Sequence, residues 1–157
     1  MNPCPCGWAG DRSNRCLCSD ERINRYRARV SGPLLDRIDL HISVARMDAV
    51  ELRESTPLGE PSASVRERVE AAHARQQARG ALNAHLPPAA LRACTKLSEG
   101  DQDLLEQAIE RLQLSARAMH RIVRVARTIA DLAGCETIQT AHLAEAIGYR
   151  QLDRGKP

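Results

Sequence analysis

The segment SARAMHRIVRVARTIADLAG, residues 115–134, has the strongest periodic pattern in the chain. Its apolar residues recur every three or four positions, which is the spacing of one face of an α-helix. The residues of this face are Ala118, Ile122, Val125, Ile129 and Leu132. Ser115 is suited to cap the start of the helix, and Gly134 is suited to end it. The segment therefore predicts an amphipathic helix that packs against other helices.

Further helical patterns occupy the rest of residues 65–157. One helix is predicted between a cap at Ser64 and Gly80, with three residues directed inward: Val65, Val69 and Ala72. Three more helices are predicted: a short one after Pro87 and Pro88, one capped by Ser98 and one capped by Thr140. The chain has no Phe, one Trp and two Tyr, so its core has to be aliphatic. This composition favours a bundle of roughly four or five packed helices.

Residues 1–46 follow a different pattern. The stretch 19–30, SDERINRYRARV, predicts a helix with Ser19 as its cap. Residues 38–44 then alternate between polar and apolar side chains, which predicts one half-buried strand. The apolar members are Ile38, Leu40, Ile42 and Val44. Because one strand cannot form a sheet, we expect this part to need strands from outside the chain, and we do not expect Met1 to begin a folding unit.

A linker is predicted between these two parts, over residues 47–64. Within it, the sequence RESTPLGEPSAS at 53–64 contains two prolines, one glycine and four serine or threonine residues. Such a composition is typical of a turn-rich connection and not of a helix or strand. The expected organisation is therefore mainly α, with a small front part that has about one strand and a Cys-rich loop, followed by a helical bundle.

The bulk composition excludes few classes of function. The 157 residues carry a formal net charge of +3, which permits an anionic partner without requiring one. No apolar run reaches the length of about 18 residues that a membrane helix needs, and the start of the chain lacks the apolar core of a signal peptide. We therefore expect a cytoplasmic location and no membrane partner. Thiols stay reduced in the cytoplasm, so clustered cysteines indicate a metal more than disulfides.

Four of the six cysteines fall near the start of the chain, in the pattern C-x-C-x9-C-x-C. They are Cys4, Cys6, Cys16 and Cys18. Four thiolates at this spacing are able to close a tetrahedral zinc site, and such a site would be structural because no coordination position stays open. The alternative interpretation is four reduced thiols in a loop. Cys94 and Cys135 stand alone and are interpreted as core or surface thiols.

Several arginines are positioned to meet an anion. Arg37 is expected at the edge of the predicted strand, where it could reach a phosphate on a neighbouring subunit; pairing with Asp36 or Asp39 is the alternative. Arg117, Arg121 and Arg124 share one face of the long helix, where the alternative is a solvated surface. The sequence has no G-x-x-x-x-G-K-[ST] and no G-x-G-x-x-G motif, so we do not expect a stand-alone enzyme.

Taken together, four stretches of the chain resemble a known family: MNPCPCG at 1–7, RYRARVSGPLLDRIDLHISV at 25–44, LSARAMHRIVRVARTIADLAG at 114–134 and AHLAEAIGYR at 141–150. They are similar to the C-terminal part of the magnesium-chelatase-like AAA+ ATPases, and within these to the ComM/YifB competence-protein family. The resemblance covers nearly the whole chain. It implies that residues 1–46 are the C-terminal part of an AAA+ α/β core and that residues 65–157 are its helical lid.

The resemblance also implies roles for single residues. Asn2 matches the sensor-1 asparagine, which helps to hold the water that attacks the γ-phosphate. Arg37 matches the arginine finger, which acts in trans on ATP held by the adjacent subunit. Arg117 matches the sensor-2 arginine of the lid, and Arg121 is a weaker candidate for that role. ATP and magnesium would be shared with Walker A and Walker B segments, which this chain lacks, so we expect no ATP hydrolysis by this chain alone.

Relatives of this kind resemble homo-hexameric, ATP-driven motors that act on DNA, with branch migration in natural transformation as the implied activity. Two other functions compete with this interpretation. The first is a non-catalytic, zinc-containing helical module that binds nucleic acid directly. The second is a chelatase subunit that inserts a metal into a porphyrin, which the cysteine pairs and the block ARTIADL at 126–132 disfavour.

Overall fold

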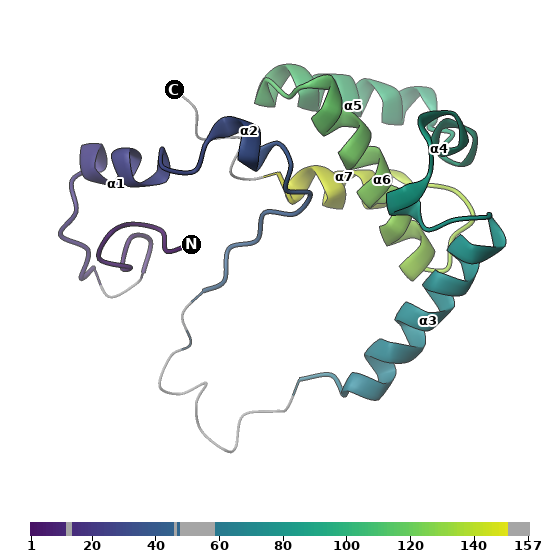
Figure 1. The fold of residues 1–157 in the computed structure, drawn as a ribbon, viewed down its shortest axis with the longest axis horizontal. Coiled ribbons are helices and arrows are strands. Elements are labelled where there is room, and N and C mark those ends of the chain that lie inside the picture. Colours follow the sequence, from purple (N-terminus) through teal and green to yellow (C-terminus); the bar gives the residue numbers. More distant parts are fainter. Residues whose placement is uncertain (12–13, 46, 48–58, 151–157) are drawn as a thin grey trace. The chain divides into compact units, whose positions relative to one another are not determined.

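The computed structural model describes residues 1–11, 14–45, 47 and 59–150. The chain divides into two compact units, Met1–Arg37 with Ser43–Pro57, and Ile38–Ile42 with Leu58–Pro157. Regular structure in the described residues consists of helices, with no β-strand among them (Figure 1). The predicted fold class, mainly α, is therefore confirmed. Most of the predicted linker at 47–64 lies outside the described residues.

The described residues of the first unit form two helices. Helix α1, Asp20–Arg27, begins as predicted behind Ser19, whose side chain accepts a hydrogen bond from the Arg22 amide at 3.3 Å. It ends before the predicted limit at residue 30. Helix α2, Gly32–Leu35, is a single turn with a proline in its first positions, where the missing amide hydrogen is not needed. Neither helix has a buried residue.

The second unit is a helical bundle, as predicted. Its elements are α3 (Ser62–Ala78), the 3₁₀ turn η1 (Asn83–His85), α4 (Pro88–Cys94), α5 (Glu99–Leu112), α6 (Ala116–Leu132) and α7 (Thr140–Gly148). The caps Ser98 and Ser115 are confirmed, because both side chains accept a backbone hydrogen bond. No helix in the described part of the chain is long and apolar enough to cross a bilayer.

Two predicted helix caps are wrong, one by three residues and the other by one. Helix α3 begins at Ser62 behind Pro61, so Ser64 lies inside the first turn and is not the cap. Helix α7 is capped by Gln139, whose side chain and that of His142 exchange hydrogen bonds with each other's backbone. Thr140 instead donates its hydroxyl to Asp101 Oδ1 at 2.6 Å, which ties α7 to α5.

Helix α6 lies at the centre of the bundle and packs against α3, η1 and α7. The core around it is aliphatic, as the composition requires, and its buried members are Leu105, Ile122, Val123, Ala126, Ala130, Ile138, Leu143, Ala146 and Ile147. The predicted stripe is only partly correct, because Val125 and Ile129 are half-buried and Leu132 is 43% exposed. Contact with α3 buries a second side of α6, and that side is polar.

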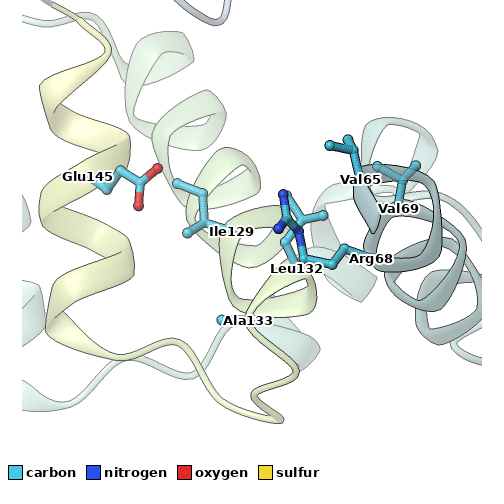
Figure 2. Close-up of a pocket in the computed structure, with 7 residues that line it drawn as sticks. All are labelled: Val65, Arg68, Val69, Ile129, Leu132, Ala133 and Glu145. Carbon is cyan, nitrogen blue, oxygen red and sulfur yellow. The ribbon is translucent and has the colours of Figure 1, made fainter. Parts of the chain in front are cut away.

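Helix α3 also departs from the prediction. Ala72 is buried as expected, but Val65 and Val69 are 38% and 51% exposed. They line a shallow groove of about 400 Å³ together with residues of α6 and α7 (Figure 2). The complete lining is Val65, Arg68, Val69, Ile129, Leu132, Ala133 and Glu145. The N-terminal half of α3 therefore stands away from the core, while its C-terminal half is attached to α6.

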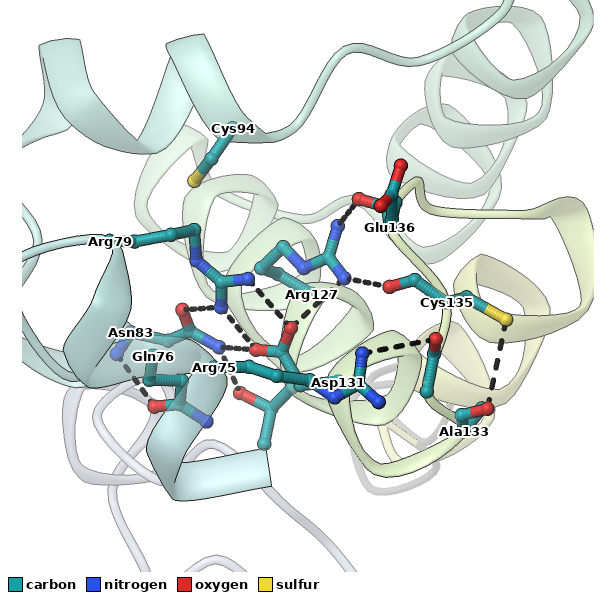
Figure 3. Close-up of polar contacts among 12 residues, drawn as sticks. Arg75, Gln76, Arg79, Asn83, Cys94, Arg127, Asp131, Ala133, Cys135 and Glu136 are labelled. Atoms are coloured by element: carbon teal, nitrogen blue, oxygen red, sulfur yellow. Dashed lines mark hydrogen bonds and ion pairs between the residues drawn. The ribbon is translucent and has the colours of Figure 1, made fainter. Parts of the chain in front are cut away.

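Asp131 is the centre of that attachment (Figure 3). Its carboxylate is buried and accepts hydrogen bonds from Arg79 Nη1 at 2.8 Å, Arg127 Nη2 at 3.0 Å and Asn83 Nδ2 at 2.8 Å. Burial acts to raise the pKa of Asp131, but the hydrogen bonds from Arg79 and Asn83 and the charge of Arg127 outweigh it and lower the pKa. The carboxylate is thus charged and joins α6 to the end of α3.

Arg127 extends the same network to the end of α6. It is 1% exposed and donates from Nη1 to the Glu136 carbonyl at 2.7 Å and from Nη2 to the Cys135 carbonyl at 2.6 Å. Gly134 ends the helix in the left-handed region at φ 75°, and Arg75 of α3 donates to its carbonyl at 3.2 Å. Charged side chains therefore hold the connection between α6 and α7.

The segment 38–42 packs with the helical unit. Buried Arg150 donates to the Ile38 carbonyl at 2.5 Å, the His41 amide donates to the Tyr149 carbonyl at 2.7 Å, and Asp39 forms an ion pair with Arg121. The strand predicted for 38–44 is unconfirmed, because a strand needs a neighbouring strand and the described residues include none. His41 is buried, whereas the four apolar members of the pattern are exposed.

Replacing Asp131 with asparagine should destabilise the chain by about 3–5 kcal/mol at pH 7, because buried Arg127 then loses its counter-charge. Urea unfolding of the 157-residue chain, followed by circular dichroism, measures the change. Asp103→Asn is the matched control, since Asp103 is an exposed carboxylate on α5. A loss similar to that of the control would show that the network does not stabilise the bundle.

The difference in stability between the wild type and Asp131→Asn should depend on pH. The folded pKa of Asp131 lies below its unfolded value of about 3.9, so its contribution is complete above that value and is lost as the pH falls through the folded pKa. The stability difference between the wild type and Asp131→Asn should therefore narrow on acidification. A difference that stays constant between pH 7 and the acid transition would contradict the charged state assigned to Asp131.

Candidate functional site

Helix α6 carries three arginines on one face, Arg117, Arg121 and Arg124, which we call the arginine row. Two of them make contacts within the helical unit, and one is exposed. Arg124 donates from Nη2 to the Leu86 carbonyl at 3.2 Å and so connects α6 to the chain after η1. The Arg121 side chain is 26% exposed and forms the ion pair with Asp39. Both side chains are therefore engaged within the helical unit, and the predicted solvated face is not formed by these two arginines.

Arg117 differs from the two arginines that follow it. It lies in the first turn of α6, is exposed, and forms no ion pair with any residue that the structure describes. Ser115 caps this turn by accepting a hydrogen bond from the Ala118 amide at 3.1 Å. The start of a helix carries partial positive charge, so a cation there gains no stabilisation from the helix itself. The same position suits a guanidinium that binds an anionic ligand.

Arg37 and Asn2 belong to the first unit. Arg37 follows α2, its amide donates to the Leu34 carbonyl at 3.0 Å, and its side chain is exposed. Asn2 is also exposed and lies beside the turn at Gly7, where an added Cβ would be 3.9 Å from Asn2 Nδ2. Neither residue borders a strand in the described chain, so the strand-edge position predicted for Arg37 is unconfirmed.

Of the predicted site residues, the four cysteines are brought together. The Sγ atom of Cys4 lies 3.3 Å from that of Cys6 and 3.7 Å from that of Cys16, and the Cys6 and Cys16 sulfurs are 3.7 Å apart. With Cys18 included, all four sulfur atoms lie within 4.8 Å of one another. Cys4 is completely buried, and the other three are more accessible. The spacing C-x-C-x9-C-x-C thus produces a compact cluster of thiols.

The electrostatics of the cluster favour one ionised sulfur. Burial acts to raise the pKa of Cys4, but hydrogen bonds from Cys6, the Ala9 amide and Cys16 lower it to about 6. The Cys18 amide lowers the pKa of Cys16, but desolvation and the neighbouring sulfurs Cys6 and Cys4 raise it to about 11. Within the cluster the pKa is therefore lowered at Cys4 and raised at Cys16 and Cys18.

The loop between the two cysteine pairs is shaped by backbone turns. The Gly7 amide donates to the Cys4 carbonyl at 3.0 Å, and Gly7 adopts φ 82°, a conformation in which a side chain is strained. The Ala9 amide donates to Cys4 Sγ at 3.3 Å. Arg15 lies over the ring of Trp8, with 5.1 Å between the guanidinium carbon and the ring centroid. These contacts fold the loop back onto Cys4.

The sequence analysis missed two sets of polar residues. The i,i+4 spacing of Arg127 and Asp131 was a signal for their ion pair, and it lies inside the ARTIADL block. The partners Arg79 and Asn83 are 52 and 48 positions away from Asp131, and no local pattern indicates them. The ion pair between Asp39 and Arg121 spans 82 positions and was likewise not predictable.

Comparison with known proteins identifies matching families over most of the chain. Residues 59–150 match the model of the magnesium chelatase subunit ChlI C-terminal region, and residues 1–52 match the model of magnesium chelatase subunit ChlI. The interval between the two matches lies in the predicted linker.

Individual relatives match along nearly the whole chain. Competence protein ComM of Haemophilus influenzae is 44% identical over 155 residues, which are 98% of this chain and 30% of the relative. The uncharacterized protein YifB of Escherichia coli is 42% identical, with the same coverage. An uncharacterized protein of Mycobacterium tuberculosis is 37% identical over 96% of this chain and 30% of its own length. The chain thus spans about a third of the length of these relatives.

Replacing Arg124 should destabilise the chain more than replacing Arg117, because among the described residues only Arg124 of the two makes a hydrogen bond to another part of the helical unit. Arg124→Ala leaves the carbonyl of buried Leu86 without its donor and should destabilise the chain by about 1–3 kcal/mol. Arg117→Ala removes an exposed side chain and should change stability by no more than about 0.5 kcal/mol. Urea unfolding of both variants tests this. Equal destabilisation by the two substitutions would make Arg117 a structural residue.

Proposed function

The chain belongs to the magnesium chelatase subunit ChlI C-terminal family, and on that premise we propose that it supplies the arginine finger, the sensor residues and the helical lid of an oligomeric AAA+ ATPase. Arg117 is the sensor-2 residue, Arg37 is the arginine finger, and Asn2 is the sensor-1 residue. Homo-hexamers would bring each Arg37 to the nucleotide of the adjacent subunit. The magnesium ion and the phosphate-binding loop belong to segments that this chain does not contain.

The observation that supports the proposal best is the exposed position of Arg117. Its two successors in the row, Arg121 and Arg124, are held by Asp39 and by the Leu86 carbonyl. Arg117 is presented at the capped start of a rigid helix, where the backbone amides and the guanidinium all favour an anion. A phosphate group fits this combination, since planar guanidinium groups bind phosphate oxygens with paired hydrogen bonds.

Each of the three proposed site residues has a separate role in ATP hydrolysis. ATP bound in the cleft supplies the phosphoryl group whose transfer to water releases the energy. The guanidinium of Arg117 would hold the γ-phosphate from the lid, so that lid position depends on the nucleotide state. Arg37 would stabilise the charge that develops on the transferred group, and the Asn2 amide would orient the attacking water. This chain alone performs none of these steps, because it lacks a loop that binds the triphosphate.

DNA is the proposed substrate of the assembled motor. One relative is named a competence protein, and the activity proposed here is branch migration of DNA during natural transformation. The net charge of +3 is compatible with an anionic partner. The lid would convert the loss of the γ-phosphate into movement against the DNA held by the ring.

Mixed oligomers test the assignment, because a residue that acts in trans can be complemented and a residue that acts in cis cannot. This chain is fused behind the ATP-binding part of the Haemophilus influenzae relative. Arg37→Ala should lower ATP hydrolysis about a thousandfold. In an equal mixture with a second variant, whose phosphate-loop lysine is replaced, the Arg37→Ala subunits supply intact loops and the second variant supplies intact fingers. Roughly a quarter of the interfaces then combine an intact loop with an intact finger and should regain activity.

The same mixture made with Arg117→Ala should stay inactive, because sensor 2 acts on the nucleotide of its own subunit. Arg22→Ala is the control, since Arg22 is an exposed arginine of α1. Full activity of Arg37→Ala on its own would refute the finger assignment. Salt-dependent DNA binding by the 157-residue chain, with hydrolysis unaffected by either arginine, would favour the nucleic-acid-binding module instead.

A further inference from the structure

We propose that Cys4, Cys6, Cys16 and Cys18 bind one zinc ion through four thiolates, and that this ion is the main force that folds the first unit. The inference is independent of ATP hydrolysis. It depends on the positions of four sulfur atoms and on the absence of an apolar core around them. Neither observation involves the helical unit.

The sulfur positions match a single tetrahedral ion. With zinc–sulfur bonds of about 2.3 Å, the sulfur atoms of a tetrahedron are about 3.8 Å apart. The observed separations of 3.3, 3.7 and 3.7 Å among Cys4, Cys6 and Cys16 are close to that value, and Cys18 lies within 4.8 Å of each. They are too long for disulfides, in which the sulfurs are about 2.05 Å apart. An iron–sulfur cluster distributes its cysteines over several iron atoms and needs a wider arrangement.

The surroundings supply the contacts that a metal-bound thiolate requires. The Ala9 amide donates to Cys4 Sγ at 3.3 Å, and the Gly7 turn places this amide by reversing the chain directly after Cys6. A backbone amide aimed at a sulfur stabilises the thiolate form, which is the form that binds a metal. Zinc binding would release the protons that remain on the four sulfurs.

The described residues of the first unit have no apolar core that could stabilise it. Among the described residues of Met1–Arg37, Cys4 is the single buried apolar residue, and neither α1 nor α2 buries a side chain. An isolated helix of eight residues is not stable in water by itself. Segments of this size that bury little apolar surface are typically stabilised by metals or disulfides. A zinc ion that joins residues 4 and 18 would close this loop and fix the residue before Ser19, the cap of α1.

The ion would also position the proposed sensor. Asn2 lies two residues before Cys4, and the intervening Pro3 carbonyl accepts a hydrogen bond from Arg27 Nε of α1 at 3.1 Å. The segment that carries Asn2 is therefore attached to α1 at one point by Arg27 and at a second point by the ion. Loss of the metal would remove one of these two attachments and leave the segment that carries Asn2 held to α1 by the Arg27 hydrogen bond.

Metal analysis of the 157-residue chain, purified without added metal, tests the proposal. We expect about one equivalent of zinc, and less than about a fifth of an equivalent for Cys4→Ser. Cys94→Ser and Cys135→Ser are matched controls that remove one thiol each outside the cluster and should retain the zinc. Less than about half an equivalent of any metal in the wild type, or iron in place of zinc, would overturn the proposal.

Two measurements on the wild type remain informative if the variants fail to fold. Four of the six thiols should react with a thiol reagent only after a chelator removes the zinc, whereas Cys94 and Cys135 react in its presence. Trp8, the one tryptophan of the chain, lies inside the loop, so its emission should change together with the release of the metal. Fast reaction of all six thiols before the chelator is added would refute the site. A total of only two or four reactive thiols after chelation, because the others form disulfides, would also refute it.

Discussion

The helical unit depends on one buried carboxylate, that of Asp131. Two guanidinium groups and one amide converge on it from α3, η1 and α6 itself, and the same Arg127 also holds the carbonyls that follow α6. A charge in this position requires all its partners, since a buried ion without a counter-charge is strongly destabilising. The helices therefore take one relative arrangement. This fixed arrangement is what allows the opposite end of α6 to present Arg117 rigidly.

The two units reach stability by different physical routes. The second unit has an aliphatic core of nine residues, with a charged network on one side of its central helix. The described residues of the first unit include one buried apolar residue and a cluster of four thiols. In the motor proposed above, the helical unit would transmit a change in position, and the thiol cluster would hold the segment that carries Asn2 without a large apolar core.

The sequence predicted most reliably what depends on neighbouring residues. The caps Ser19, Ser98 and Ser115 are correct because a cap hydrogen-bonds within its own turn. The cysteine pairs likewise needed only a short loop to bring them together. The orientation of α6 was predicted less well, because its second buried face consists of Arg127 and Asp131, which a pattern of apolar residues does not include. The segment 38–42 shows the same limit, since its contacts with Tyr149 and Arg150 come from the far end of the chain.

The central claim is that Arg117 and Arg37 contact nucleotides in clefts completed by other parts of an AAA+ ring. A structure of the assembled ring, with a non-hydrolysable ATP analogue bound, measures this directly. The account predicts that Arg117 hydrogen-bonds the γ-phosphate of the nucleotide in its own subunit, and that Arg37 hydrogen-bonds the γ-phosphate of the nucleotide in the adjacent subunit. A bound nucleotide whose phosphates contact neither guanidinium would contradict it.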